Sequence, residues 1–382
     1  MSNTSRMTVN VISLNTPFPP NYGGVIDIFY LIKALKRLGV KIILHSFEYE
    51  RPRASELQSL CAETYYYKRQ TGIAANLSLL PYNVVGRRDP QLLKHLLENE
   101  HPIIFESLHS CYFMNAPQLN GRLKIFRPGN IEHDYYQFLA KACRNPISKT
   151  FHRLEAWKFK QYEHVLKSAN IIVPISETDT AYMQTAFPNS TIQFIPAFHA
   201  NESVKSCPGI GNFILYHAKL SVHENEQIAL FLTEKIFSKL RETCVIAGMN
   251  PSQRIRQAIS TYPNIQLEAN PDSDRMEKLI KEAHIHILPT FQPTGLKLKL
   301  LNSLFEGRHI IANRPMLAGS GLDELCHIAD TSQEILHVCR QLMQQPFSTE
   351  EIEQRRQRLI PFYTSSFQAR ELIRLISVHT SA

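Results

Sequence analysis

The segment 293–302, with the sequence PTGLKLKLLN, carries the strongest chemical signal in the chain. It follows a predicted strand that ends near residue 289 and opens a predicted helix. A helix N-terminus offers backbone N–H groups and the positive end of a dipole, and both stabilise a bound anion. Gly295 permits close approach of the backbone, and Lys297 and Lys299 add positive charge. The segment therefore suits a diphosphate, although a solvated amphipathic helix with its leucines inward explains the pattern equally well.

Two glycines occupy the matching place in the N-terminal half of the chain. Gly23 and Gly24 follow Tyr22 in the loop after a predicted strand at 8–14, and a helical pattern begins there. Paired glycines allow close approach to a phosphate or a sugar, while an ordinary tight turn is the competing interpretation. The G-x-G-x-x-G fingerprint is missing, which argues against a dinucleotide-dependent dehydrogenase.

Polar side chains follow three further predicted strands. They are Lys219 after the strand 213–217, Glu106 and His109 after 103–105, and Arg127, Asn130, Glu132 and His133 after 124–126. In parallel sheets, ligands bind beyond the carboxyl ends of the strands. A carboxylate, an amide and an imidazole there can bind sugar hydroxyls or move protons, whereas helix capping and loop hydrogen bonds are the alternative for each.

Patterns that suggest a metal site have simpler explanations. Asp272-Ser-Asp274 matches a D-x-D motif, but it stands at a predicted helix start, where an aspartate serves as the N-cap. His284 and His286 alternate on a predicted strand. We therefore expect no metal. Ser348 and Glu351 are spaced for a capping box.

Strands and helices alternate along most of the chain, which predicts parallel, doubly wound sheets. In the second half the predicted strands are 213–217, 244–247, 265–267, 284–288 and 309–312. Residues 196–212 have little periodicity and are interpreted as a linker. We therefore expect an N-terminal Rossmann-like domain over 1–200 and a second over 201–362.

The composition fits this organisation. The 382 residues are 43% hydrophobic and 20% charged, which favours two globular domains and excludes a mostly disordered chain. Seven scattered cysteines without a C-x-x-C argue against a disulfide framework and favour a reducing compartment, so we expect a cytoplasmic protein. No apolar run reaches the roughly 18 residues of a membrane span, and the N-terminal run is too short for a signal peptide.

The net charge of +8 suits phosphate-bearing ligands or an anionic membrane surface. Nucleic acid is not expected, since no nucleic-acid-binding module is recognisable. A helical pattern over about 145–167 combines basic and aromatic side chains, and peripheral membrane contact through it remains open beside a solvated amphipathic helix. The residues concerned are Arg153, Trp157, Lys158, Lys160 and Tyr162.

Taken together, the order and spacing of these motifs resemble the retaining glycosyltransferases of family 4. The resemblance covers nearly the whole chain and is carried by residues 16–24, 105–109, 127–133, 215–220, 247–248 and 294–307. It implies the GT-B fold, an α/β architecture of two Rossmann-like domains that face each other across a cleft. It also implies that a C-terminal helix, within 363–382, crosses back to the first domain.

The resemblance implies a transferase that moves a sugar from a nucleotide-diphospho-sugar to an acceptor hydroxyl with retention, without a metal or cofactor. Expected acceptors are glycans or lipid-linked glycans of cell-surface polysaccharide synthesis, at the inner face of the membrane or in the cytoplasm. Expected catalytic residues are Lys219, Lys299, Glu106 and His109; donor-binding residues are Gly23, Gly24, Lys219, Thr294, Gly295, Leu296, Lys297, Lys299 and Asn302; acceptor or sugar contacts are Arg127, Asn130 and His133.

Three positions depart from the family pattern. Asn302 replaces a glutamate that binds the nucleotide ribose, Glu224 stands where a second basic residue is common, and Gly129 replaces a histidine near the reacting carbon. These departures keep a second hypothesis open, a non-catalytic relative that binds a nucleotide sugar or a partner protein. A nucleotide-sugar epimerase on the same fold is a third.

Overall fold

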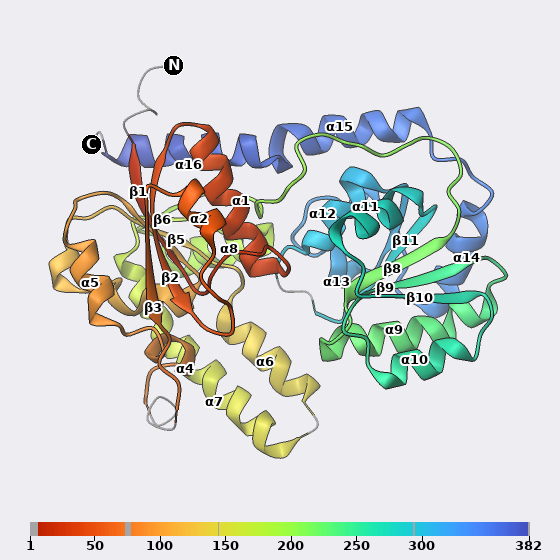
Figure 1. Cartoon of the computed structure of the whole chain (residues 1–382), viewed down its shortest axis with the longest axis horizontal. Coiled ribbons are helices and arrows are strands. Elements are labelled where there is room, and N and C mark those ends of the chain that lie inside the picture. The colour runs from red at the N-terminus through yellow and green to blue at the C-terminus, as the bar shows by residue number, and fades with distance from the viewer. Residues whose placement is uncertain (1–6, 73–77, 144, 293–294, 381–382) are drawn as a thin grey trace. The chain divides into compact units, whose positions relative to one another are not determined.

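The computed structural model describes residues 7–72, 78–143, 145–292 and 295–380. The chain divides into two compact units. The first comprises Met1–Ala200, Thr294–Leu296 and Ser365–Ala382, and the second comprises Asn201–Pro293 and Lys297–Thr364. Each unit has its own parallel sheet (Figure 1).

Within the described residues, the first unit has a seven-stranded sheet in the order β3-β2-β1-β4-β5-β6-β7, and all its neighbouring strands pair parallel. The order reverses direction between β1 and β4. The strands are β1 (Thr8–Ser13), β2 (Lys41–Glu48), β3 (Glu63–Lys68), β4 (Ile103–Glu106), β5 (Lys124–Arg127), β6 (Ile171–Ile172) and β7 (Thr191–Ile192).

Helices connect and cover these strands, as right-handed crossovers between parallel strands require. The α-helices are α1 (Gly23–Arg37), α2 (Ser55–Leu60), α4 (Tyr82–Val85), α5 (Pro90–Leu96), α6 (Glu132–Ala142), α7 (Pro146–Tyr162), α8 (Glu177–Ala186) and α16 (Ser365–Thr380). Short 3₁₀ helices are η2 (Leu108–Phe113), η3 (Pro117–Leu119) and η4 (Glu163–Ser168).

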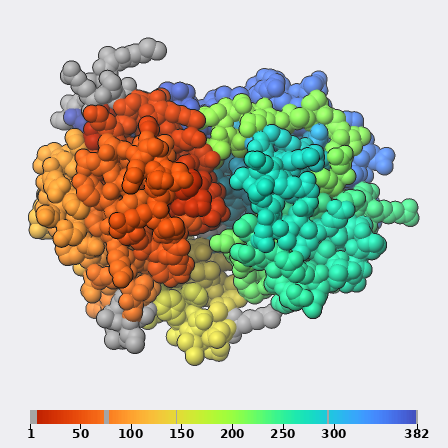
Figure 2. Space-filling view, in the orientation of Figure 1, coloured from red at the N-terminus to blue at the C-terminus, as the bar shows by residue number. Residues whose placement is uncertain are grey.

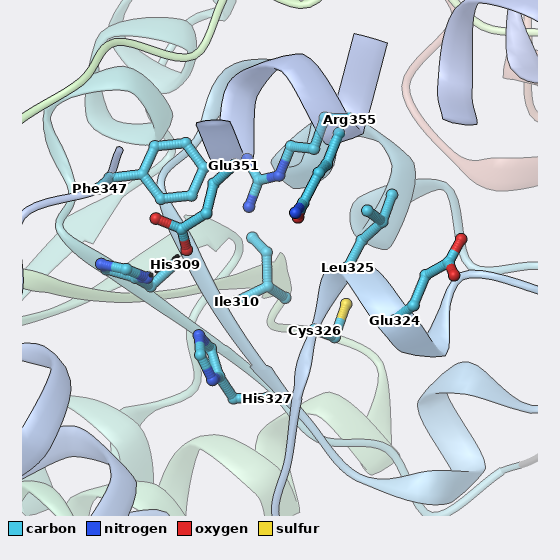
Figure 3. A pocket seen from close by; sticks show the side chains of 10 residues that line it. His309, Ile310, Glu324, Leu325, Cys326, His327, Phe347, Glu351 and Arg355 are labelled. Atoms are coloured by element: carbon cyan, nitrogen blue, oxygen red, sulfur yellow. Dashed lines mark ion pairs between the residues drawn. The ribbon is translucent and has the colours of Figure 1, made fainter. Parts of the chain in front are cut away.

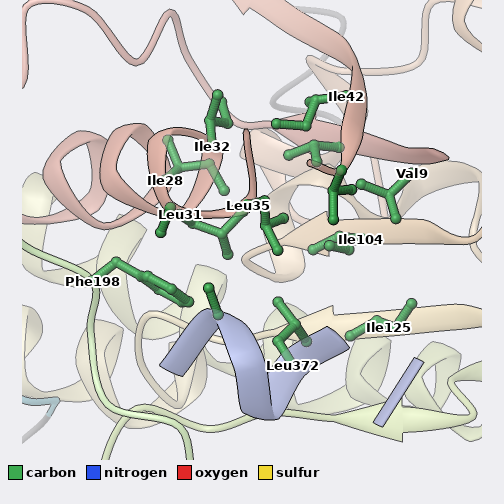
Figure 4. Packing of buried hydrophobic residues seen from close by; sticks show 14 of the residues in the cluster. Val9, Ile28, Leu31, Ile32, Leu35, Ile42, Ile104, Ile125, Phe198 and Leu372 are labelled. Carbon is green, nitrogen blue, oxygen red and sulfur yellow. The ribbon is translucent and has the colours of Figure 1, made fainter. Parts of the chain in front are cut away.

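Alternation along the strands divides the core of the first unit into two layers. On β1, Val9 and Val11 face one cluster, while Ile12 belongs to the cluster on the other face. The first cluster includes Leu31 of α1 and Leu372 of α16, and Figure 4 shows these side chains converging on the sheet. The last helix of the chain is thus part of the core of the first unit.

One buried ion pair joins the helix layer to the sheet in this unit. Arg127, the last residue of β5, donates from Nε and Nη2 to the two carboxylate oxygens of Asp27 on α1, each at 2.8 Å. Its guanidinium also donates to the carbonyl oxygens of Ile195 and Pro196. Asp27 in turn accepts the backbone N–H of Phe198 at 2.6 Å. The pair therefore fixes α1 and residues 195–198 relative to β5.

In the described part of the second unit, a six-stranded parallel sheet has the order β10-β9-β8-β11-β12-β13, which reverses between β8 and β11. Its strands are β8 (Ile214–Lys219), β9 (Cys244–Met249), β10 (Ile265–Ala269), β11 (Ile285–Leu288), β12 (His309–Ala312) and β13 (His327–Ile328). Its helices are α9 (His223–Lys235), α10 (Gln253–Ser260), α11 (Ser273–Glu282), α12 (Leu298–Glu306), α13 (Arg314–Leu317), α14 (Ser332–Leu342), α15 (Thr349–Tyr363), η5 (Phe237–Lys239) and η6 (Asp323–Leu325).

Two helix-start predictions are confirmed. Asp272 caps α11 by accepting the backbone N–H of Arg275 at 2.7 Å. Ser348 and Glu351 form a complete capping box at the start of α15. The Asp272 motif is therefore explained by backbone geometry.

The strand predictions for the second unit are confirmed within one or two residues at each end. The segment 196–212 was interpreted as a linker, but its second half is bound to the second unit. Lys205 donates its backbone N–H to the carbonyl oxygen of Phe305 at 2.7 Å, and Gly209 forms a bridge with Phe347. In the first unit, β3 and the short helices α2, α4 and α5 lack a clear periodic signal and were not predicted.

The buried ion pair gives a stability prediction. Asp27→Asn leaves the fully buried guanidinium of Arg127 without a charged partner, and removing one member of a buried pair costs about 3–5 kcal/mol. We expect the free energy of unfolding of the first unit to fall by that amount in urea denaturation. The control is Glu371→Gln, which removes the exposed pair with Arg374 on α16 and should change little. Equal effects of the two substitutions would contradict this account.

Candidate active site

Polar residues of the second unit gather at the carboxyl edge of its sheet, where the strand order reverses. Lys219 is the last residue of β8, and Thr290 follows the end of β11. Lys299 lies on the first turn of α12, the helix that comes after β11. Ligands of doubly wound sheets bind at such a reversal point. The topology therefore brings the two predicted lysines to the same edge.

Lys299 is the most unusual of these groups. Its Nζ lies 5.4 Å from the centre of the Tyr216 ring, and the side chain is half-buried. Burial lowers the pKa of Lys299 to about 8, although the carboxylate of Glu224 opposes the shift. Among the residues that the structure describes, no carboxylate reaches ion-pair distance of this ammonium group. A desolvated cation without such a partner gains most from an anionic ligand.

The carboxylate of Glu224 accepts hydrogen bonds from the loop between β11 and α12. Its Oε1 accepts the Thr290 hydroxyl at 2.6 Å and the backbone N–H of Phe291 at 2.9 Å. Asn313 accepts the backbone N–H of Thr290 and donates to its carbonyl oxygen. Glu224 therefore holds the loop that leads to α12. These hydrogen bonds give a structural reason for a glutamate at this position, where a second basic residue was expected from the resemblance.

A layer of buried polar side chains supports α12 beneath Lys299. Ser303 Oγ lies 3.1 Å from His217 Nε2 and 3.5 Å from His286 Nδ1. Burial, together with the charge of Lys299, lowers the pKa of His217 to about 3, so this ring is neutral. His286 also bonds the carbonyl oxygen of Ile280 through Nε2. These contacts fix the position of the helix that bears Lys299.

The start of α12 contains several of the other predicted donor-binding residues. Lys297 is the N-cap residue and gives no side-chain cap, and Leu296 is buried. Gly295 has φ +66, and an added Cβ would lie 2.6 Å from Asn130 Oδ1 within the first unit. A glycine is thus required there for conformation and for space. Thr294 lies outside the described residues.

Asn302 is the residue that replaces the expected glutamate. Its Oδ1 accepts a hydrogen bond from Asn201 Nδ2 at 3.1 Å, and Asn201 is buried. The carboxamide therefore already has a partner within the second unit. Its NH₂ group can donate to a hydroxyl, but the position supplies no negative charge.

In the first unit, Glu106 occupies the corresponding reversal point between β1 and β4. It is the last residue of β4, and its Oε2 accepts the backbone N–H of Leu14 at 3.0 Å. Burial raises the pKa of Glu106 to about 8, and the charge of Asp27 adds to the shift. The carboxyl group is therefore mainly protonated near pH 7 and can donate a hydrogen bond.

The two glycines at the start of α1 leave open space beside Glu106. An added Cβ at Gly23 would meet nothing within 4 Å, and at Gly24 it would meet Tyr22 at 3.8 Å and Glu106 Oε1 at 4.0 Å. Burial raises the pKa of Tyr22, and the charge of Glu106 acts in the same direction. Packing inside the first unit therefore does not explain the glycine pair.

His109 is held by a carboxylate. Its Nε2 lies 3.3 Å from Glu132 Oε2, and the Ser107 hydroxyl donates to Glu132 Oε1 at 2.9 Å. Burial would raise the pKa of Glu132, but the charge of His109 and the hydrogen bonds from His109 and Ser107 outweigh it and lower this pKa. The arrangement orients the imidazole of His109, and an oriented imidazole is one requirement for proton transfer.

Two of the predicted acceptor contacts are occupied by internal partners. The guanidinium of Arg127 is bound to Asp27 and to two carbonyl oxygens. His133 Nδ1 lies 3.2 Å from Glu163 Oε1, and its Nε2 lies 3.5 Å from Asp134 Oδ1. Both side chains are buried, so these contacts argue against a role in sugar binding. Asn130 is half-buried, and its Oδ1 lies beside Gly295.

Sequence reasoning missed two side chains that organise the site. Arg87 donates from Nε and Nη2 to the Leu14 carbonyl oxygen at 2.9 and 2.7 Å, and so holds the loop after β1. No local pattern marks Arg87, because its partner lies 73 positions away. Thr290 could have been found from its place directly after a predicted strand.

At Gly129, an added Cβ would meet nothing within 4 Å, and the backbone there has no positive φ. A side chain would therefore fit at this position within the first unit. The absence of a histidine is a property of the sequence and is not imposed by packing.

Over the described residues, no helix has the length and apolar character needed to cross a bilayer.

Comparisons with known proteins identify the fold. No family model matches the chain. An uncharacterised 44.6 kDa protein in the cps region of Klebsiella pneumoniae is 22% identical in an alignment of 346 residues that covers 85% of this chain and 88% of that protein. This identity indicates a distant relative.

Solved structures match almost the whole chain. A glycosyltransferase from Rickettsia africae has a TM-score of 0.67 at 12% identity and covers 97% of this chain and 98% of its own. Anabaena HepE, solved in complex with UDP and glucose, has a TM-score of 0.65 at 12% identity and covers 98% of this chain and 100% of its own. The predicted two-domain α/β fold is thus confirmed, and the chain has the GT-B fold of glycosyltransferases.

Proposed function

We propose that this protein transfers a sugar from a nucleotide-diphospho-sugar to an acceptor hydroxyl with retention of configuration. The observation that carries the proposal is the half-buried Lys299, which has a pKa of about 8 and lies at the start of a helix beside the reversal point of the second sheet. The combination suits a diphosphate better than a neutral ligand, because the ligand would restore the electrostatic stabilisation that burial removes.

In the proposed reaction, the bond between the sugar C1 and the diphosphate oxygen breaks while negative charge develops on the diphosphate. Lys219, Lys299 and the N-terminus of α12 stabilise this charge. Preorganised groups of this kind are effective because they need no reorganisation at the moment of reaction. The polar layer of Ser303, His217 and His286 supplies that preorganisation by fixing α12.

The acceptor hydroxyl attacks from the face that the diphosphate leaves, and the leaving phosphate oxygen takes its proton. A dedicated protein base is then not needed. Glu106, protonated near pH 7, donates a hydrogen bond to a sugar or acceptor oxygen in this proposal, and the open space at Gly23 and Gly24 admits the substrate. His109, oriented by Glu132, is the second candidate for a proton-handling group.

The comparisons support the substrate classes. HepE was solved with UDP and glucose, which are the parts of a nucleotide-sugar donor. The Klebsiella relative comes from a cps region, which favours an acceptor from cell-surface polysaccharide synthesis.

Helix α7 supports contact with a membrane-bound acceptor. Four apolar side chains on this helix are exposed, namely Ile147 at 83%, Phe151 at 38%, Leu154 at 47% and Trp157 at 54%. The helix lies at the molecular surface, in yellow in Figure 2. Arg153 and Lys160 are exposed as well, whereas Lys158 and Tyr162 are buried and therefore leave the predicted membrane-facing set. An apolar stripe with flanking cations fits an anionic bilayer surface.

A non-catalytic nucleotide-sugar-binding protein is the second candidate. The neutral Asn302, already bound to Asn201, and the missing side chain at Gly129 favour it. An epimerase on the same fold would convert the donor without an acceptor.

The first test is activity with a panel of UDP- and GDP-sugars, read as nucleotide release with and without glycan acceptors. We expect the wild-type protein to turn over at least one donor. Lys299→Ala should lower turnover by about 10²–10³, which is typical when one preorganised electrostatic group is lost. Lys278→Ala, on the exposed face of α11, is the control and should leave turnover unchanged. Donor binding without turnover across the panel would favour the non-catalytic protein.

The pKa of Lys299 predicts how binding depends on pH. Above a pH of about 8 the free protein loses the ammonium charge, so the affinity for UDP should fall between pH 7 and pH 9.5. Lys299→Arg keeps its charge over this range and should show a shallower dependence. Calorimetric titration with UDP at each pH measures both. Parallel pH profiles for the two proteins would refute the role given to Lys299.

Vesicle sedimentation tests the α7 surface. The wild-type protein should sediment with vesicles of phosphatidylglycerol and phosphatidylcholine at low salt and be released at high salt, because the charge attraction is screened. Replacing Leu154 and Trp157 together by serine should reduce the bound fraction several-fold. Val378→Ser, at an exposed apolar position on α16, is the matched control. Unchanged binding of the double variant would exclude α7 as the contact surface.

A further inference from the structure

A second cluster of polar side chains lies at the amino edge of the second sheet, opposite the edge that bears Lys219. His309 is the first residue of β12, His327 is the first residue of β13, and Glu351 lies on the first turn of α15. They line a cavity of about 80 Å³. Figure 3 shows the two imidazoles and the carboxylate grouped on one side of this cavity. The cluster is separate from the proposed transferase site.

The hydrogen bonds of His309 fix its tautomer. Nε2 lies 3.0 Å from the carbonyl oxygen of Gln345 and must be the donor, since a carbonyl oxygen only accepts. With its proton on Nε2, the neutral imidazole carries its lone pair on Nδ1. Nδ1 is buried and has no hydrogen-bond partner among the described residues. A buried acceptor in this state is costly unless it binds something electropositive.

The group that faces this lone pair is a carboxylate. Glu351 Oε1 lies 3.6 Å from His309 Nδ1, while Oε2 accepts the backbone N–H of Ser348 at 2.8 Å in the capping box. The capping box thus fixes the carboxylate with one oxygen directed at the imidazole. Two electron-rich atoms without a hydrogen between them repel each other, and a cation between them turns the repulsion into attraction.

His327 completes a set of three ligands. Its ring centre lies 5.6 Å from that of His309, and one donor atom from each of His309, His327 and Glu351 lies within 4.8 Å of the others. Ligand atoms around tetrahedral zinc are about 3.3–3.5 Å apart, because the bonds to nitrogen and oxygen are about 2.0–2.2 Å long. His309 Nδ1 and Glu351 Oε1, which are 3.6 Å apart, are already close to that spacing.

Neighbouring groups do not take this role. His284 accepts the backbone N–H of Gly211 on Nδ1 and bonds the Leu342 carbonyl oxygen through Nε2, so both of its nitrogens are used. Arg355 lines the cavity, but its guanidinium donates to carbonyl oxygens of Leu304, Gly307 and Arg308. Neither side chain therefore satisfies His309 Nδ1 or Glu351 Oε1.

We propose that His309 Nδ1, His327 and Glu351 Oε1 bind a divalent transition metal ion, with zinc as the best match to two imidazoles and one carboxylate. Ligating histidines usually donate their other N–H to a carbonyl or carboxylate, as His309 does to Gln345. The ion ties β12, β13 and α15 together and is structural, because the site lies at the sheet edge opposite Lys219 and Lys299. From the sequence alone we expected no metal ion, so this site differs from that prediction. The proposed metal site is independent of the transferase activity.

The test is zinc titration of the metal-free full-length protein against a chromophoric chelator. The wild-type protein should bind one zinc ion more tightly than its other histidines and cysteines do, and zinc should raise its melting temperature. Glu351→Gln keeps the capping box, since glutamine serves at that position, but loses the charged ligand. We expect its affinity to fall by about 10–100-fold or more.

The chain offers a matched control. Glu334 forms the equivalent capping box with Thr331 at the start of α14, so Glu334→Gln should leave zinc binding unchanged. His327→Gln should weaken binding as Glu351→Gln does, and cobalt(II) in place of zinc should give a tetrahedral visible spectrum only while all three ligands are present. Wild-type protein without a tight zinc site, or equal affinities in wild type, Glu351→Gln and His327→Gln, would overturn the proposal.

Discussion

The proposed donor site depends on a lysine that the fold partly removes from water and that, among the described residues, has no carboxylate within ion-pair distance. The tertiary structure brings Lys299 over the ring of Tyr216, and the nearby carboxylate of Glu224 is bound to the loop after β11. The cost of this desolvation appears as a lowered pKa. In the proposed function, a ligand that carries two phosphates recovers that cost, so the same arrangement would supply both affinity and selectivity for charge.

In the first unit, burial shifts the pKa of an acidic group, Glu106. Burial of Glu106 at the end of β4 favours its neutral form, and the backbone N–H of Leu14 is too weak a partner to reverse the shift. In both units the group with the shifted pKa lies where the strand order reverses. At that point neighbouring connections leave the sheet in opposite directions, which leaves open space above the strand ends. A parallel sheet thus determines where a desolvated group and a ligand can meet.

Different sites are proposed at the two edges of the second sheet. The carboxyl edge bears the lysines and the helix start of α12, while the amino edge bears His309, His327 and the capping box of α15. A structural ion at the amino edge would stabilise the sheet without disturbing the chemistry at the other edge. The capping carboxylate of Glu351 would then serve the helix with one oxygen and the metal with the other.

Local chemistry in the sequence determined the alternation of strands and helices, the caps at Asp272 and Ser348, and the position of Lys299 at a helix start, because each depends on residues a few positions apart. The sequence could not determine which polar side chains are bound to partners inside the fold. Arg127 is bound to Asp27, 100 positions away, and His133 is bound to Glu163, so both were predicted as ligand contacts although their polar atoms are engaged inside the fold. The protonation of Glu106 and Lys299 and the pairing of His309 with Glu351 were likewise decided by the tertiary structure, since burial and distant partners set them.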